Sequence, residues 1–96
     1  RVVGVHDGDT ITVLTADKES LRVRLGEIDA PESGQPYGAR AKQALAALVF
    51  GKDVLIDVQG SDRYGRTLGR VHHGDMDVNA EMIRTGCAWA YRAYLT

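Results

Sequence analysis

Cysteine is almost absent from this chain of 96 residues, which contains Cys87 alone. A single thiol cannot form an internal disulfide, so we expect the fold to rest on hydrophobic packing, aided at most by a metal. Cys87 itself is more typical of a small buried hydrophobe than of a nucleophile. One cysteine is compatible with either an oxidising or a reducing compartment.

Long apolar runs and an excess of one charge are also missing. No stretch approaches the roughly 20 apolar residues that a membrane-spanning helix needs, so we expect no membrane association. Twelve Lys and Arg face thirteen Asp and Glu, and the net charge of −1 argues against binding nucleic acid by bulk positive charge. An enzyme with locally arranged charge stays possible. The composition, 44% hydrophobic and 26% charged, is typical of a folded chain, and we expect one domain over residues 1–96.

Hydrophobic spacing divides the chain into strands and helices. Alternating or β-branched apolar residues predict five strands, at residues 1–6, 10–15, 21–25, 53–59 and 68–72. Val58 is expected to be buried in the fourth of them. Apolar residues at helical spacing predict a helix over residues 38–50 and a shorter one that contains Val78 and Met82. Trp89 is expected in the core.

This order of elements fits a small Greek-key barrel of the OB type. We therefore expect an α+β domain dominated by β structure: a five-stranded OB-fold barrel with two helices, or three if another one follows. OB-folds commonly bind oligonucleotides, but a fold alone does not establish a function.

Four acidic residues fall in two loops that each follow a predicted strand: Asp7, Asp9, Asp29 and Glu32. Two such loops can converge at one end of a barrel. Oxygen ligands alone suit a hard cation, Ca²⁺ or Mg²⁺, rather than zinc. The alternative is that residues 7–9 are only a turn and Glu32 is a solvated loop residue.

Two arginines accompany these acids. Arg24 lies on the polar face of a strand, five residues before Asp29, and Arg66 follows Gly65 in a tight turn. Carboxylates that hold a cation, together with guanidiniums opposite them, are what phosphoryl transfer needs. The alternative is that Arg24 pairs with a surface acid and Arg66 caps a turn.

Three segments now carry a resemblance: VHDGDT at residues 5–10, RLGEIDAPE at residues 24–32 and DRYGR at residues 62–66. Their order and spacing resemble the signature segments of the staphylococcal nuclease (thermonuclease) family. The resemblance implies an OB-fold endonuclease, a Ca²⁺-dependent phosphodiesterase that hydrolyses DNA and RNA and leaves 3′-phosphate ends. By motif position, Asp9 and Asp29 resemble the carboxylates that hold one Ca²⁺ ion. The carbonyl of Ala30 resembles the backbone ligand, and Asp7 resembles an acid behind them.

The same resemblance implies roles in catalysis and in substrate binding. Arg24 and Arg66 resemble the two phosphate-binding arginines, and Glu32 resembles the general base or the residue that orients the attacking water. Three further positions resemble those that contact a bound nucleotide: Arg63, Tyr64 and Tyr94. Arg63 replaces the family's more familiar lysine.

Several expectations follow about the protein as a whole. The family usually continues into a third, C-terminal helix, which we expect this chain to lack. We expect a monomer that acts on DNA and RNA and prefers single strands. The sequence does not give the compartment; family members are often secreted or periplasmic. The alternative function is a non-catalytic nucleic-acid-binding or scaffolding module. The joint presence of Arg24, Glu32 and Arg66 argues against it, because such modules lose the catalytic residues.

Overall fold

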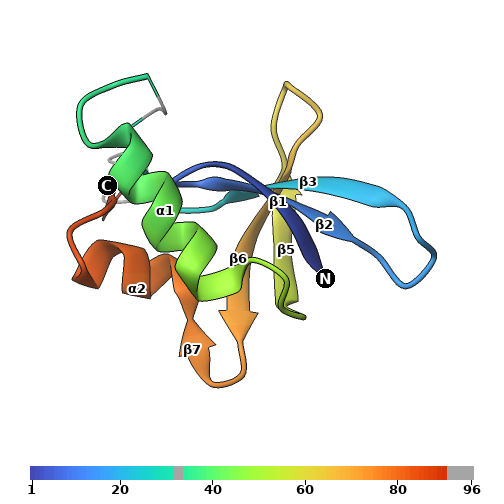
Figure 1. Cartoon of the computed structure of the whole chain (residues 1–96). Helices are drawn as coiled ribbons and strands as arrows, with labels where there is room; N and C mark the ends of the chain where they lie inside the picture. The colour runs from blue at the N-terminus through green and yellow to red at the C-terminus, as the bar shows by residue number, and fades with distance from the viewer. Residues whose placement is uncertain (32–33, 91–96) are drawn as a thin grey trace.

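The computed structural model describes residues 1–31 and 34–90, and the elements of this part of the chain follow the order β1-β2-β3-β4-α1-β5-β6-β7-α2-β8 (Figure 1). The five longer strands are β1 (Val2–Asp7), β2 (Thr10–Leu14), β3 (Ser20–Leu25), β5 (Leu55–Ser61) and β6 (Thr67–His73). The helices are α1 (Gly38–Val49) and α2 (Val78–Arg84). Three short strands complete the set: β4 (Ile28–Asp29), β7 (Met76–Asp77) and β8 (Trp89–Ala90). The predicted strands and helices are thus confirmed, and the three short strands are additional.

The main sheet is mixed, with strand order β1-β2-β3-β6-β5 and with β7 paired to β6. Strands β1, β2 and β3 pair in antiparallel fashion, as do β5 and β6, whereas β3 and β6 are parallel. In that parallel pair, Val23 lies opposite Thr67 and Arg24 lies opposite Leu68. The end of β3, which carries Arg24, therefore lies next to the start of β6, which directly follows Arg66.

The two edges of this sheet approach each other through β1. The amide of Val2 donates to the carbonyl of Lys52 at 2.9 Å, and the amide of Gly51 donates to the carbonyl of Val2 at 3.0 Å. No ladder joins β1 to β5 within residues 1–31 and 34–90, so the sheet is not fully closed. The expected α+β fold, OB-like and with two helices, is confirmed.

Both helices pack against the sheet and against each other: α1 contacts β1, and α2 contacts β6 (Figure 1). Helix α1 buries Gly38, Ala41, Leu45 and Val49, which share one helical face. Of the helices in the described residues, none is long and apolar enough to cross a membrane. The buried hydrophobic cluster joins helices and sheet; its members are Val2, Ile11, Val13, Val23, Leu25, Ile28, Ala30, Ala41, Leu45, Val49, Val71, Val78, Met82 and Ala88.

Two residues that were expected in the core are exposed instead. Val58 is 61% exposed, because β5 is an edge strand whose register is irregular between Val58 and Gly60. Trp89 is 51% exposed, because β8 pairs with the short strand β4 rather than with the main sheet. The expectation for both side chains was wrong, and Trp89 lies at the surface opposite Asp29.

Close packing fixes the turn between β1 and β2. A Cβ atom at Gly8 would lie 2.7 Å from the Cβ of Ala41 and 2.9 Å from the Cβ of Ala30, so no larger residue fits without a shift. The turn thus packs between α1 and the segment that follows β4. It holds Asp9 beside Ala30, and the two acidic loops meet as the sequence predicted.

Candidate active site

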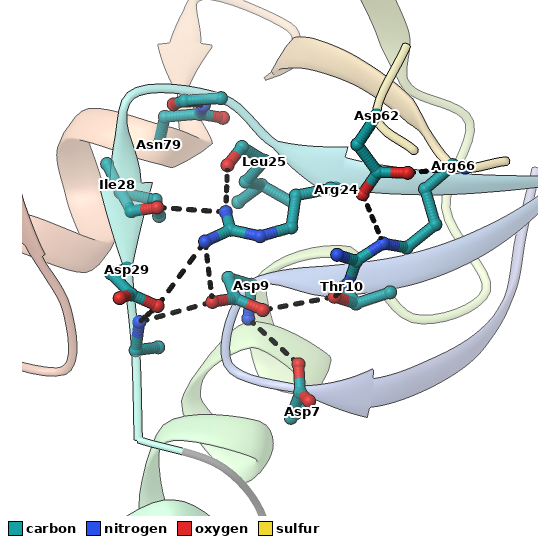
Figure 2. A network of polar contacts seen from close by, with 12 residues as sticks. Asp7, Asp9, Thr10, Arg24, Leu25, Ile28, Asp29, Asp62, Arg66 and Asn79 are labelled. Carbon is teal, nitrogen blue, oxygen red and sulfur yellow. Dashed lines mark hydrogen bonds and ion pairs between the residues drawn. The ribbon is translucent and has the colours of Figure 1, made fainter. Parts of the chain in front are cut away.

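The guanidinium of Arg24 lies at the centre of the site, where it contacts the end of β3, β4 and the turn before β2 (Figure 2). Its Nη1 donates to the carbonyls of Leu25 at 2.7 Å and Ile28 at 2.8 Å. Its Nη2 lies 3.3 Å from an oxygen of Asp29 and 3.5 Å from an oxygen of Asp9. One planar cation therefore closes the turn between β3 and β4 and also holds two carboxylates from different loops.

The backbone amide of Ala30 joins the same two carboxylates. It donates to Asp29 Oδ1 at 3.0 Å and to Asp9 Oδ2 at 3.2 Å. The other oxygen of Asp9 accepts a hydrogen bond of 3.0 Å from the hydroxyl of Thr10. The carboxylate of Asp7 lies behind this pair, where it accepts from the amide of Asp9 at 3.5 Å. Asp7, Asp9 and Asp29 are thus brought together around one amide and one guanidinium.

Burial makes the charge of Asp9 costly. The residue is only 7% exposed, and this desolvation is the largest cause that raises the pKa of its carboxyl, which is about 7. The hydrogen bond and the negative charge of Asp7 add to the rise, whereas Arg24 and Thr10 oppose it. One arginine therefore does not fully compensate the acids, and further positive charge beside Asp9 would stabilise its ionised form.

Arg66 is held in place by Asp62, the first residue of the same loop. The Arg66 Nε donates to Asp62 Oδ2 at 2.6 Å, and the Arg66 amide donates to Asp62 Oδ1 at 2.9 Å. Desolvation alone would raise the pKa of Asp62, but hydrogen bonds from Arg66 and from the Tyr64 amide hold it below its ordinary value. Asp62 therefore stays ionised, and it orients the guanidinium of Arg66 at the wall of the groove.

The hydroxyl of Thr10 links the contacts around Arg24 to those around Arg66. Its Oγ1 donates to Asp9 and lies 3.5 Å from Nη1 of Arg66 (Figure 2). Arg24 and Arg66 both line a groove of about 540 Å³, and Asp29 lies on its wall. The structure therefore places the two predicted phosphate-binding arginines and the carboxylate of Asp29 at one groove.

The other predicted residues lie at the rim of this groove or outside the described chain. Arg63 and Tyr64 line it, and Tyr64 is 72% exposed. The guanidinium carbons of Arg63 and Arg66 lie 5.4 and 5.5 Å from the centre of the Tyr64 ring. Glu32 and Tyr94 lie outside the described residues, so their placement stays a prediction.

Two residues that position the site were not identified from the sequence. Asp62 holds Arg66, as described above. The side chain of Asn79 is fully buried; it donates to the carbonyl of Gly26 at 2.8 Å and accepts from the amide of Val71 at 3.0 Å. Asn79 thereby ties the turn after β3 to β6. The only sequence signal for it was a polar residue on the apolar face of a predicted helix.

The oxygen atoms of Asp9 and Asp29 are the candidate donors for a metal ion. Within residues 1–31 and 34–90, no cluster of three or more His, Cys, Asp or Glu side chains is arranged as a metal site. The two carboxylates that share the Ala30 amide nevertheless offer oxygen atoms only, and Asp29 is 39% exposed at its side chain. Oxygen donors with uncompensated negative charge fit a hard divalent cation.

Comparison with known proteins agrees with this arrangement. The family model for staphylococcal nuclease homologues matches residues 22–96. An "uncharacterized endonuclease" of Haemophilus influenzae is 48% identical over 98% of the chain and 53% of its own length. A "micrococcal nuclease" of Shigella flexneri is 49% identical over 98% of the chain and 59% of its own length, and "protein ParB" of Escherichia coli is 52% identical over 96% and 56%.

The chain thus spans between 53% and 59% of the length of these curated relatives. The family model covers more than three quarters of the chain, including both arginines, Asp29 and the loop that begins at Asp62. The match with the family model and the identity to its relatives agree with the observed fold. The chain belongs to the family of staphylococcal nuclease homologues.

Proposed function

We propose that this chain is a nuclease, a phosphodiesterase that hydrolyses DNA and RNA with Ca²⁺ as its cofactor and leaves 3′-phosphate ends. One observation carries the proposal: Arg24 and Arg66 line the same groove beside the paired carboxylates of Asp9 and Asp29. A phosphodiester is an anion whose negative charge grows on its non-bridging oxygens during hydrolysis. Two guanidiniums that their neighbours already hold beside the groove can stabilise that charge.

The same carboxylates would hold the cation. Asp9 and Asp29, with the carbonyl of Ala30, provide oxygen ligands of the kind that Ca²⁺ prefers. A bound Ca²⁺ ion supplies positive charge that offsets these acids and the charge that grows on the phosphate. Asp7, which accepts a hydrogen bond from the amide of Asp9, would stabilise the turn that carries Asp9.

The chain's own residues would then divide the remaining work. Arg24 and Arg66 bind the phosphate, and Glu32 orients the water whose oxygen attacks phosphorus. The bond from phosphorus to the 5′-oxygen breaks, and a proton passes to that oxygen as it leaves. Arg63 and Tyr64 at the rim, together with Tyr94, would contact the nucleotide.

We further propose that the chain prefers single-stranded substrate. A phosphodiester that meets both Arg24 and Arg66 must enter a groove of about 540 Å³, and a single strand can bend its backbone into such a groove more readily than a regular duplex can. The net charge of −1 gives little long-range attraction that could help to separate two strands. Denatured or A·T-rich regions should therefore be cut first.

Digestion of heat-denatured DNA and of RNA in Ca²⁺, in Mg²⁺ and in chelator tests the proposal. We expect cleavage in Ca²⁺, little in Mg²⁺ and none in chelator, with ends that a polymerase extends only after phosphatase treatment. Matched single-stranded and G·C-rich duplex oligonucleotides test the strand preference. Full activity in chelator would refute the metal assignment, and binding without cleavage in all buffers would favour the non-catalytic module.

A further inference from the structure

A second groove, of about 690 Å³, lies beside the start of α1. Its walls come from Pro31, from the start of α1 and the residues just before it, from residues 85–87 and from β8, and they include Pro36, Tyr37, Arg40 and Trp89. It is larger than the groove between the arginines but contains none of the carboxylates or arginines of the candidate active site. The proposed hydrolysis assigns it no role.

The two grooves are neighbours across one short ladder. Asp29 lines the first groove and Trp89 lines the second. These two residues lie directly opposite each other in the pairing of β4 with β8. Nucleotides that flank a phosphate bound beside Asp29 are therefore within reach of Trp89.

The side chains of the second groove are unusual for a free surface. Trp89 is 51% exposed and Tyr37 is 75% exposed, so two aromatic residues that line this groove are open to solvent. Tyr37 also has a left-handed backbone, with φ of 65°, a conformation that aromatic residues disfavour and that is often found at binding sites. Arg40 is exposed as well, and it has no ion pair with any other residue that the structure describes.

We propose that this second groove binds the nucleotides of a single strand that flank the reactive phosphate, with a base stacked on Trp89 or Tyr37 and a phosphate on Arg40. The inference rests on the proposed function. Exposed aromatic rings beside an arginine are the recurring features of single-strand sites, because every base has a stacking face and every linkage has a charge. A peptide would fit the apolar wall, but the ladder pairing of Trp89 with Asp29, which lines the groove of the two arginines, favours nucleic acid.

Trp89 is the only tryptophan of the chain, so it reports directly on occupancy of this groove. We suggest titrating the chain in chelator, where no cleavage is expected, with a dinucleotide and with an eight-nucleotide strand of DNA. The expected result is quenching of Trp89 fluorescence by the octanucleotide at concentrations where the dinucleotide has little effect. Free N-acetyltryptophanamide corrects for absorption by the nucleotides.

Variants separate the groove from the active site. Arg40→Ala should raise the octanucleotide Kd about fivefold or more, as loss of one good contact in a single-strand site does. Lys42→Ala is the matched control, because Lys42 also lies exposed on α1 but does not line the groove. In Ca²⁺, Trp89→Leu should raise KM for long strands about fivefold or more while kcat and the cleavage of dinucleotides stay within about twofold. Circular dichroism checks that each variant is folded.

The outcomes distinguish this inference from the proposed function. Cleavage in Ca²⁺ without quenching of Trp89, or with equal effects of Trp89→Leu on short and long strands, would refute binding of the strand in this groove. The proposed nuclease activity would still hold. Quenching by the octanucleotide without any cleavage would refute the nuclease and support the groove as the site of a binding module. Equal losses in Arg40→Ala and Lys42→Ala would show that only the general charge of α1 matters, which would overturn the assignment.

Discussion

Replacement of Asp9 by asparagine removes the most costly charge of the metal-free site and leaves its shape. Asparagine has the same size as aspartate, and its oxygen can accept from the amide of Ala30 and from Arg24 where Asp9 Oδ2 does now. Its NH₂ group can donate to the hydroxyl of Thr10, which can accept as well as donate. The variant should therefore keep the turn and lose only the charge.

The expected size of the effect follows from the pKa of Asp9. A carboxyl whose pKa is raised by folding holds its proton more tightly in the folded state. The folded state is thus favoured at low pH, and that advantage is lost as the pH rises from the ordinary value of 3.8 to about 7. One pKa unit corresponds to about 1.36 kcal/mol, so the full penalty above pH 7 is about 4 kcal/mol at most. Between pH 5 and pH 8 the penalty should grow by roughly 2.5 kcal/mol.

Urea unfolding in chelator at these two pH values measures the difference. The free energy of unfolding of Asp9→Asn, minus that of the unmodified chain, should increase by about 2 kcal/mol from pH 5 to pH 8. Asp17→Asn is the matched control, since it removes the same charge from the exposed turn between β2 and β3 and should leave the difference unchanged.

A constant loss of stability in Asp9→Asn at both pH values would refute this reasoning. It would mean that the hydrogen bonds of the ionised carboxylate hold the turn and that its charge is not a burden. Calcium gives an independent measurement, because an ion held by Asp9 and Asp29 should stabilise the unmodified chain and stabilise Asp9→Asn far less.

Three further predictions concern the arginine loop and the turn. Arg66→Lys should fold normally and lose about 10³-fold in kcat, because lysine keeps the charge but not the planar fork, whereas Arg84→Lys on the exposed end of α2 should keep its activity. Asp62→Asn should lower kcat about 10- to 100-fold, since Arg66 then lacks its ionised partner, and added salt should not restore it. Gly8→Ala should lower the free energy of unfolding by about 1–3 kcal/mol in urea titrations, because its Cβ meets two other Cβ atoms. Gly4→Ala is its control, since a Cβ there meets only Thr12 at an ordinary 3.7 Å, and similar losses in both would contradict the packing argument.

The longer strands and helices could be predicted because their apolar residues recur at the spacing typical of each type of element. A strand that buries one face alternates, as Leu21, Val23 and Leu25 do, and a helix that buries one face repeats every three to four residues. The strands β4 and β8 have two residues each, too few for a period to show. Their pairing joins residues about sixty positions apart, and it decides that Trp89 is exposed. A local pattern contains no information on such a pairing.

The candidate site was predictable for the residues that carry the chemistry and less so for those that position them. Asp9, Asp29 and Arg24 could be grouped because their loops and strand belong to one barrel end. Asp62 and Asn79 act mainly on backbone groups, and the sequence does not show which amides and carbonyls lie near a side chain. For those two residues, the structure was needed.

Three locally unfavourable features gather around the segment that contains β4. Asp9 carries a buried carboxyl, Tyr37 has a left-handed backbone, and Trp89 exposes an indole ring. Exposed apolar side chains also occur elsewhere, at Phe50, Leu55 and Val58, and Lys18 has a left-handed backbone too. What distinguishes this segment is that a buried carboxyl, a left-handed aromatic residue and an exposed indole lie beside the two grooves, and this combination indicates a requirement other than folding. A strand of nucleic acid with its cation would relieve two of the three, by placing positive charge beside Asp9 and a base against Trp89.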